Sequence, residues 1–153
     1  MGRYGVDTSV SVERSIGEIQ STLQRYGADG FLHGWKGAQA MVQFEMQERR
    51  IRFMLVLPDR DAREFTHTPS RGTKRSASQA LEAYEQACRQ RYRALALVIK
   101  AKLEAVESGI TQFEDEFLAH IVLPDGSQVR DHVRPAIAAS YERGAMVPLL
   151  PDR

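Results

Sequence analysis

The chain has 153 residues, with 21 Lys and Arg, 20 Asp and Glu, and a formal net charge of +1 at pH 7. This length is typical of a single domain, and a hydrophobic fraction of 42% is enough to form a core, so an intrinsically disordered chain is excluded. A net charge near zero selects no class of partner. The single cysteine, Cys88, excludes an internal disulfide and a multi-cysteine zinc site, and it is typical of a reducing cytosol.

The apolar stretches of the sequence are short. The first eleven residues are polar and glycine-containing, unlike a signal peptide. The longest apolar runs, 53–57 and 94–99, are far shorter than the roughly 18 residues of a membrane span. We therefore expect a cytoplasmic protein that makes no membrane contact.

The first periodic segment predicts a helix. Apolar side chains recur at intervals of three and four residues from Val12 to Tyr26, which places them on one helical face. Ser11 precedes this segment as a candidate N-cap, and Gly27 follows it as a stop signal.

The next segment, 31–57, predicts three antiparallel strands in a meander. Its apolar residues alternate with a period of two, and the alternation is interrupted at 36–38 and 47–49. The opposite face of these strands is polar and suits water or a polar partner. It carries Gln43 and Glu45 opposite Arg50 and Arg52.

The segment from Pro58 to Arg75 separates the strands from the helical part of the chain. It contains two prolines and a glycine and has almost no apolar periodicity. A structureless stretch of this length is uncommon inside a compact domain and is usually a functional loop or disordered. We expect a mobile basic loop.

A long helix follows. Ser76 and Gln79 have the spacing of a capping box, and Gly109 is a stop signal. Between them one apolar stripe keeps helical spacing, and the helix would be about 48 Å long. The strands and this stripe each expose one apolar face, so we expect them to pack together with Leu95 and Ile99 near the centre.

The C-terminal third predicts two shorter helices and a tail. Thr111-x-x-Glu114 forms a second capping-box pattern, which would open the first of them, and 124–126 is a turn. The second spans about 129–143, where Pro135 should delay its start or kink it. The tail, 145–153, is apolar and proline-punctuated, and we expect it to dock on another surface.

These elements predict one α+β domain over residues 1–153, with the long helix packed on the sheet. The N-terminal helix and the β-meander would occupy 11–57, the mobile basic loop 58–75, the helical part 76–144 and the apolar tail 145–153.

Motifs of known catalytic chemistry are absent from the sequence, which has no phosphate-binding glycine loop, G-x-S-x-G or H-E-x-x-H. Cys88 lies on the apolar stripe, where a buried, inert thiol is expected. Glu116 and His120 are four residues apart and would share a helical face, which leaves open a metal role or a surface pair. We expect a non-enzymatic protein with no catalytic residues, no metal site and no cofactor.

The strongest functional signal is a cluster of basic residues. The segment from Arg71 to Arg93 contains six cationic residues but only two acidic ones, Glu82 and Glu85, and two tyrosines lie among them. Arginines on a loop beside a polar β-face suit contacts with phosphates, and tyrosine offers a stacking surface. The alternative is a solvated helix face. The predicted nucleic-acid-binding residues are Arg50, Arg52, Arg71, Lys74, Arg75, Arg89 and Arg93.

The order of helix, meander, basic loop and long helix over 12–108 resembles the core of the phage single-strand annealing recombinases. Those proteins assemble into rings or filaments and hold DNA in a basic groove between the sheet and a long helix. The segments FEDEFLAHIVLPDG and YERGAMVPLLPDR also look like parts of small uncharacterised proteins of phages and other mobile elements. The resemblance supplies no catalytic residues and implies a role in binding or annealing single-stranded DNA.

Two functions follow from these features. The first is a nucleic-acid-binding protein for single-stranded DNA, and a continuous basic stripe would favour it. The alternative is a protein-binding adaptor or inhibitor that uses the long helix and the tail, and acids interrupting the stripe would favour it. Leu97 and Val98 lie off the main apolar stripe, so we also expect a homo-oligomer unless the later helices cover them.

Overall fold

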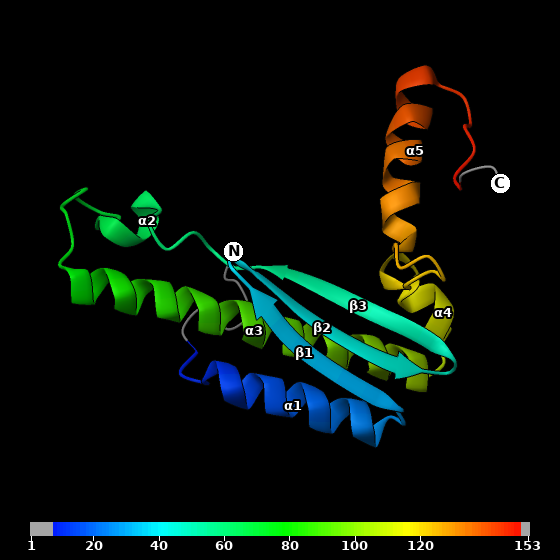
Figure 1. Cartoon of the computed structure of the whole chain (residues 1–153), viewed down its shortest axis with the longest axis horizontal. Coiled ribbons are helices and arrows are strands. Elements are labelled where there is room, and N and C mark those ends of the chain that lie inside the picture. The colour runs from blue at the N-terminus through cyan, green and yellow to red at the C-terminus, as the bar shows by residue number, and fades with distance from the viewer. Residues whose placement is uncertain (1–7, 151–153) are drawn as a thin grey trace.

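The structure is a computed structural model that describes residues 8–150 and has an α+β fold, as predicted (Figure 1). Its elements are, in order, α1 (Val12–Arg25), β1 (Gly30–Lys36), β2 (Gln39–Met46), β3 (Arg49–Val56), α2 (Arg63–Thr66), α3 (Ala77–Glu107), α4 (Phe113–Glu116), the 3-10 turn η1 (Leu118–His120) and α5 (Val129–Arg143). None of the helices within residues 8–150 is both long enough and apolar enough to cross a membrane.

The predicted first helix is confirmed, together with its cap. The Ser11 hydroxyl accepts a hydrogen bond from the backbone N–H of Arg14 at 3.1 Å, which satisfies one of the free donors at the start of α1. Gly27 follows the helix with a φ of +94°, a conformation that favours glycine. The apolar face of α1 buries Ile19 and Leu23 completely.

The predicted meander is also confirmed. The strands pair in the order β1-β2-β3, all antiparallel, and residues of β2 alternate between buried and more exposed positions. The register places Gln43 opposite Arg52 and Glu45 opposite Arg50, so these polar residues share the face away from the core. The β2–β3 turn places Gln47 and Glu48 at positive φ, as a tight hairpin turn requires.

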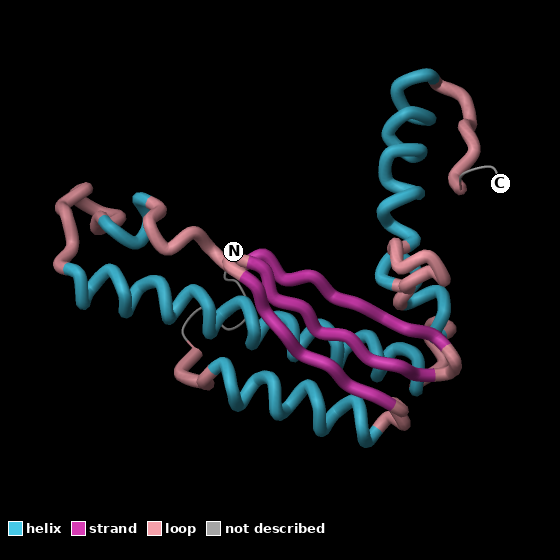
Figure 2. Tube along the Cα trace, viewed as in Figure 1, coloured by secondary structure: helices cyan, strands magenta, loops and turns pink. Residues whose placement is uncertain are grey.

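The sheet and two helices form a two-layer core. Figures 1 and 2 show α1 and α3 side by side on one face of the three strands. Leu95 and Ile99 of α3 belong to one buried cluster with Phe44 and Ile51 of the sheet, as the apolar stripe predicts. The capping box at Ser76 and Gln79 is present, with both of its hydrogen bonds.

The segment 58–75 is more structured than its sequence indicates. It contains the short helix α2 and a β-bridge between His67 and Lys74. Phe65 is only 5% exposed and meets Tyr84 of α3 edge-on at 5.8 Å. The prediction of a structureless loop is therefore wrong, because one aromatic anchor can hold a segment that has no periodicity. The mobility of this segment stays a prediction.

The helix predicted after the Thr111 capping-box pattern was assigned the wrong N-cap residue and too great a length. Gln112 is the N-cap residue, it makes no side-chain cap bond, and α4 has only four residues. After η1, Ile121 forms a β-bridge with Ile51, and the Val122 N–H donates to the Arg50 carbonyl at 2.8 Å. The edge of the sheet thus offers the backbone partners that end the helix early.

The last helix, α5, has the predicted bounds, and Pro135 does not delay its start. It ends at Gly144, whose φ is +67°. Figure 1 shows α5 standing away from the sheet, with the tail returning beside it. The Val147 N–H donates to the Ser140 hydroxyl at 3.1 Å, so the described part of the tail, 145–150, lies against its own helix. Residues 151–153 of the predicted tail lie outside the described residues.

Candidate nucleic-acid interface

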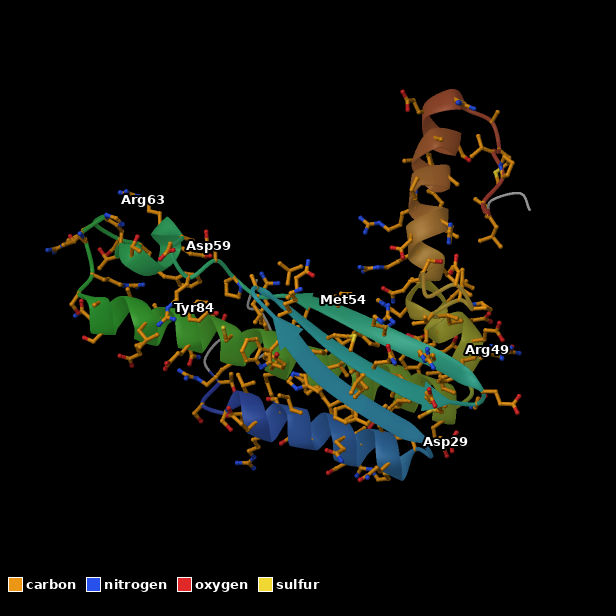
Figure 3. The ribbon with its side chains drawn as sticks, in the orientation of Figure 1. Asp29, Arg49, Met54, Asp59, Arg63 and Tyr84 are labelled. Atoms are coloured by element: carbon orange, nitrogen blue, oxygen red, sulfur yellow. The ribbon has the colours of Figure 1, made fainter. Side chains whose placement is uncertain are left out.

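The seven predicted basic residues lie in three separate places rather than in one stripe. Three lie in the loop before α3, two in the middle of α3 and two on β3; these are Arg71, Lys74 and Arg75, then Arg89 and Arg93, then Arg50 and Arg52. Figure 3 labels Arg63 near the first group and Arg49 near the third, and the two labels lie at opposite ends of the molecule. The fold therefore separates the groups, and the continuous basic stripe that would favour nucleic-acid binding over the adaptor alternative does not form.

The arginines of β3 are engaged by neighbouring polar groups. Arg50 forms an ion pair with Glu45 across the strands at 3.2 Å. The Arg52 guanidinium donates to the Gln43 side-chain oxygen at 3.0 Å and to the Gly126 carbonyl at 3.4 Å. Arg49 pairs with Glu114 at 3.6 Å. Acids and amides thus interrupt positive charge at this end of the sheet.

The loop group combines one structural arginine with two exposed cations. The Arg75 guanidinium donates to the carbonyl oxygens of Glu64 and Phe65, each at 3.2 Å, and so ties α2 to the start of α3. Arg71 and Lys74 are exposed, and their side chains make no ion pair within residues 8–150. They are available to a ligand.

The middle group lies next to a groove between two helices. Arg89 donates two hydrogen bonds to the Gln86 side-chain oxygen, and Arg93 pairs with Glu18 of α1. Beside this pair lies a groove of about 610 Å³, which we call the α1–α3 groove. Its lining residues are Arg14, Gly17, Glu18, Ser21, Thr22, Arg25, Arg93, Ala96, Leu97 and Lys100.

Helical spacing explains how this groove is built. The lining residues of α1 recur every three or four positions from Arg14 to Arg25, and those of α3 do so from Arg93 to Lys100. Each set therefore forms a stripe along its helix. Within the α1 stripe, Gly17 and Ser21 lie between Arg14 and Arg25, and their small size leaves room for a ligand's backbone.

The α1–α3 groove concentrates positive charge in a nearly neutral protein. Among residues 8–150, four cationic side chains line it, and Glu18 supplies the only lining carboxylate. Glu18 lies 3.7 Å from Arg14 and also pairs with Arg93, which holds both guanidinium groups at the groove. Arg25 and Lys100 are exposed and make no ion pair or hydrogen bond through their side chains within the described 8–150.

Three of these cations are not among the residues predicted from the sequence. Arg14 and Arg25 are eleven residues apart on α1, and Lys100 is seven residues beyond Arg93 on α3. Both spacings return to nearly the same helical face, which is a detectable signal. What the sequence does not give is the packing of α1 against α3, which brings the two stripes together.

The other residues considered for chemistry have structural partners. Glu116 forms an ion pair with Lys102 at 3.1 Å, and the His120 ring stacks on Phe53 at 4.1 Å. Burial lowers the pKa of His120, and the nearby charges of Lys102 and Arg130 lower it further. Among residues 8–150, no three His, Cys, Asp or Glu side chains are grouped to hold a metal.

Cys88 is half-buried, so the prediction of a buried thiol is wrong in degree. A hydrogen bond with Cys88 is the largest cause that raises the pKa of Tyr84, followed by partial burial. Tyr92 is almost fully buried, and its hydroxyl lies 3.3 Å from Nε2 of His33. Tyr92 therefore belongs to the core rather than to a binding surface.

Comparison of the chain with protein-family models, with curated proteins and with solved structures finds no match in any of the three. The resemblance to annealing recombinases, which concerns the order of elements, stays a prediction.

Proposed function

We propose that this is a non-enzymatic nucleic-acid-binding protein whose phosphate-binding surface is the α1–α3 groove. The observation that carries the proposal is the arrangement of four cations from two helices along one groove, with a single carboxylate among its described lining residues. Neutralisation of phosphates by Lys and Arg supplies most of the affinity of sequence-independent binding. A local excess of positive charge in a protein of net charge +1 is the electrostatic footprint expected of such a surface.

The dimensions of the groove suit a nucleic-acid strand. At 1.5 Å per residue, Arg14 and Arg25 are separated by about 16 Å along α1, and Arg93 and Lys100 by about 10 Å along α3. A strand in a duplex advances about 3.4 Å per phosphate, so these distances span several nucleotides. The Ser21 hydroxyl adds a neutral donor of the kind that contacts phosphate oxygens.

Glu18 has a defined role in this proposal. Its carboxylate pairs with Arg14 and Arg93 and so positions both guanidinium groups before a ligand binds. Arg25 and Lys100 are the cations that phosphate would neutralise first, because no carboxylate within residues 8–150 forms an ion pair with either of them. Of the residues predicted from the sequence, Arg93 lies in the groove, and Arg89 lies one helical turn before it.

The test is a binding measurement with a labelled oligothymidine at two salt concentrations. Replacing Arg25 and Lys100 with Glu should weaken binding at least roughly tenfold and reduce the logarithmic salt slope by about 1.4, because each lost phosphate contact on a single strand contributes about 0.7. The matched control replaces Arg134 and Arg143, two exposed arginines of α5, with Glu. It makes the same change in net charge away from the groove. Equal losses in both variants, or no binding by the parent at low salt, would contradict the proposal.

A second candidate function, protein binding through the long helix, is favoured by a separate observation. The face of α3 opposite the core forms an apolar groove of about 960 Å³ with α2, which we call the α2–α3 groove. Leu97 and Val98 line it, and Val98 is 44% exposed. The later helices do not cover these residues, so the reason for expecting a homo-oligomer remains.

We propose that a second copy of the chain occupies the α2–α3 groove. Its lining includes both Glu64 and Arg91, so a two-fold pairing can place the carboxylate of one copy against the guanidinium of the other. Light scattering tests this assignment. A dimer that Val98→Asp dissociates supports it, whereas a 17.3 kDa monomer at high micromolar concentration overturns it.

A further inference from the structure

The helix α5 carries an apolar stripe that the rest of residues 8–150 does not bury. The structure describes the whole of α5, and none of its residues is buried. The tail returns along one side of the helix, where the Val147 N–H donates to the Ser140 hydroxyl. On the opposite side, helical spacing aligns Ile137, Ala138 and Tyr141, and Ile137 and Tyr141 are 43% and 86% exposed. Because an isolated helix of this length is marginal in water, the stripe indicates a partner.

The α2–α3 groove has the length and the lining that suit a helix. Along α3 it runs from Ala87 to Ala101, which is about 21 Å, and α5 is about 22 Å long. Ala87, Ala94 and Ala101 recur every seven residues, so these small side chains form one row and allow a second helix to approach closely. All of the lining residues lie between 58 and 101, so the arm of the same chain does not fill the groove. An apolar helix face laid in such a groove is a common mode of recognition.

The charges of the groove and of α5 are complementary. Glu64 and Arg91 line the groove, are exposed, and form no ion pair within residues 8–150. Arg134 and Glu142 of α5 are also exposed and without an ion pair in the same residues. They lie about 12 Å apart along the helix, on either side of the apolar stripe. One direction of α5 along the groove therefore places Arg134 against Glu64 and Glu142 against Arg91.

The shape of the molecule allows two copies to make this contact twice. Figure 1 shows α2 and α5 rising from the same side of α3 but at opposite ends of the molecule. A two-fold axis that sets two copies antiparallel thus brings the arm of each toward the groove of the other. We propose that α5 of one copy occupies the α2–α3 groove of a second copy and that the two copies exchange their arms reciprocally. This inference rests on the second candidate function. Glu64 and Arg91 then pair with the partner's arm rather than directly with each other.

Sedimentation of the full chain over a range of concentrations tests the arm. Ile137→Asp should raise the dissociation constant of the dimer at least roughly 100-fold, because it places an unpaired carboxylate in both arm–groove contacts. The matched control is Ile110→Asp, the same substitution at a residue that follows α3 and is 81% exposed. This control should dimerise as the parent does. Circular dichroism should show the same helical content in both variants.

An exchange of charges tests the direction of α5 in the groove. Arg91→Glu and Glu142→Arg should each raise the dissociation constant roughly tenfold, because each replaces an attraction by a repulsion at both contacts. The two substitutions in one chain should restore the affinity of the parent. No restoration would overturn the proposed docking of the arm.

The failure of this inference is distinguishable from that of the groove assignment. A dimer that Val98→Asp dissociates and Ile137→Asp does not would overturn the exchange of arms and leave a second copy in the α2–α3 groove. Equal dissociation by Ile110→Asp would also overturn the role of the arm. A 17.3 kDa monomer at high micromolar concentration would overturn both.

Discussion

The N-terminal body and the C-terminal arm of this protein are each stabilised by different interactions. The body, made of α1, the sheet and α3, buries a continuous apolar cluster in which Leu23, Ile51 and Ile99 are fully inaccessible. The arm, made of α5 and the tail, has no buried residue within its helix, and α5 packs mainly on η1 at its base. Figure 1 shows this difference as a layered body with one helix projecting from it.

This difference teaches which interactions can hold a helix in place. Burial of apolar surface stabilises α3, whereas an isolated helix of about 15 residues is marginal in water. The arm depends instead on its ends. At its start the Asp131 carboxylate accepts a hydrogen bond from the Gln128 N–H at 2.8 Å, and Gly144 ends it in a left-handed conformation. The stability of the body should therefore respond most to substitutions of buried apolar residues, and that of the arm to substitutions at the ends of its helix.

The largest effect is expected in the body. Ile99→Ala should lower the free energy of unfolding by about 2–5 kcal/mol, because it leaves a cavity at the centre of the core. Val98→Ala, one residue earlier and 44% exposed, is the matched control and should cost less than about 1 kcal/mol. Urea unfolding measures both variants. Equal losses would mean that α3 does not depend on one buried face.

A smaller and local effect is expected in the arm. Gly144→Ala should cost about 1 kcal/mol, because alanine is strained at a φ of +67° while a Cβ would meet no atom within 4 Å. Faster hydrogen exchange should be confined to the amides of α5. Gly17→Ala, inside α1 with equally open surroundings, should instead stabilise the protein by about 0.5–1 kcal/mol. Faster exchange throughout α3 after Gly144→Ala would show that arm and body unfold together.

The smallest effect concerns the junction between the two regions, where the His120 ring stacks on Phe53. Because the folded-state pKa of His120 is lowered from 6.5, the unfolded chain binds its proton more readily. Stability should therefore fall as the pH drops below about 6.5 toward the lowered folded value, and it should be fully present above 6.5. Urea midpoints across this range should depend less on pH in His120→Gln. The dependence should not vanish, since burial also lowers the pKa of His33. An unchanged pH profile would show that His120 protonates without loss of packing.

The amino-acid sequence determines most of the local structure of this protein. Helical periodicity with the caps at Ser11 and Ser76 specifies α1 and α3, and alternation specifies the meander, because these signals lie within a few neighbouring residues. The same reasoning missed α2, which depends on the contact between Phe65 and Tyr84. It also predicted a longer helix in place of α4, whose end is set by pairing of Ile121 with the edge of the sheet.

Tertiary structure alone decides how the charges are grouped. The sequence places Arg71 to Arg93 in one basic segment, but the fold ties Arg75 to the carbonyls of α2 and pairs Arg93 with α1. It also places Arg25 and Lys100 along the same groove, although 74 residues separate them in the chain. A charged side chain acts through distance in space, and that distance is fixed only when two helices bury their apolar faces against the same sheet.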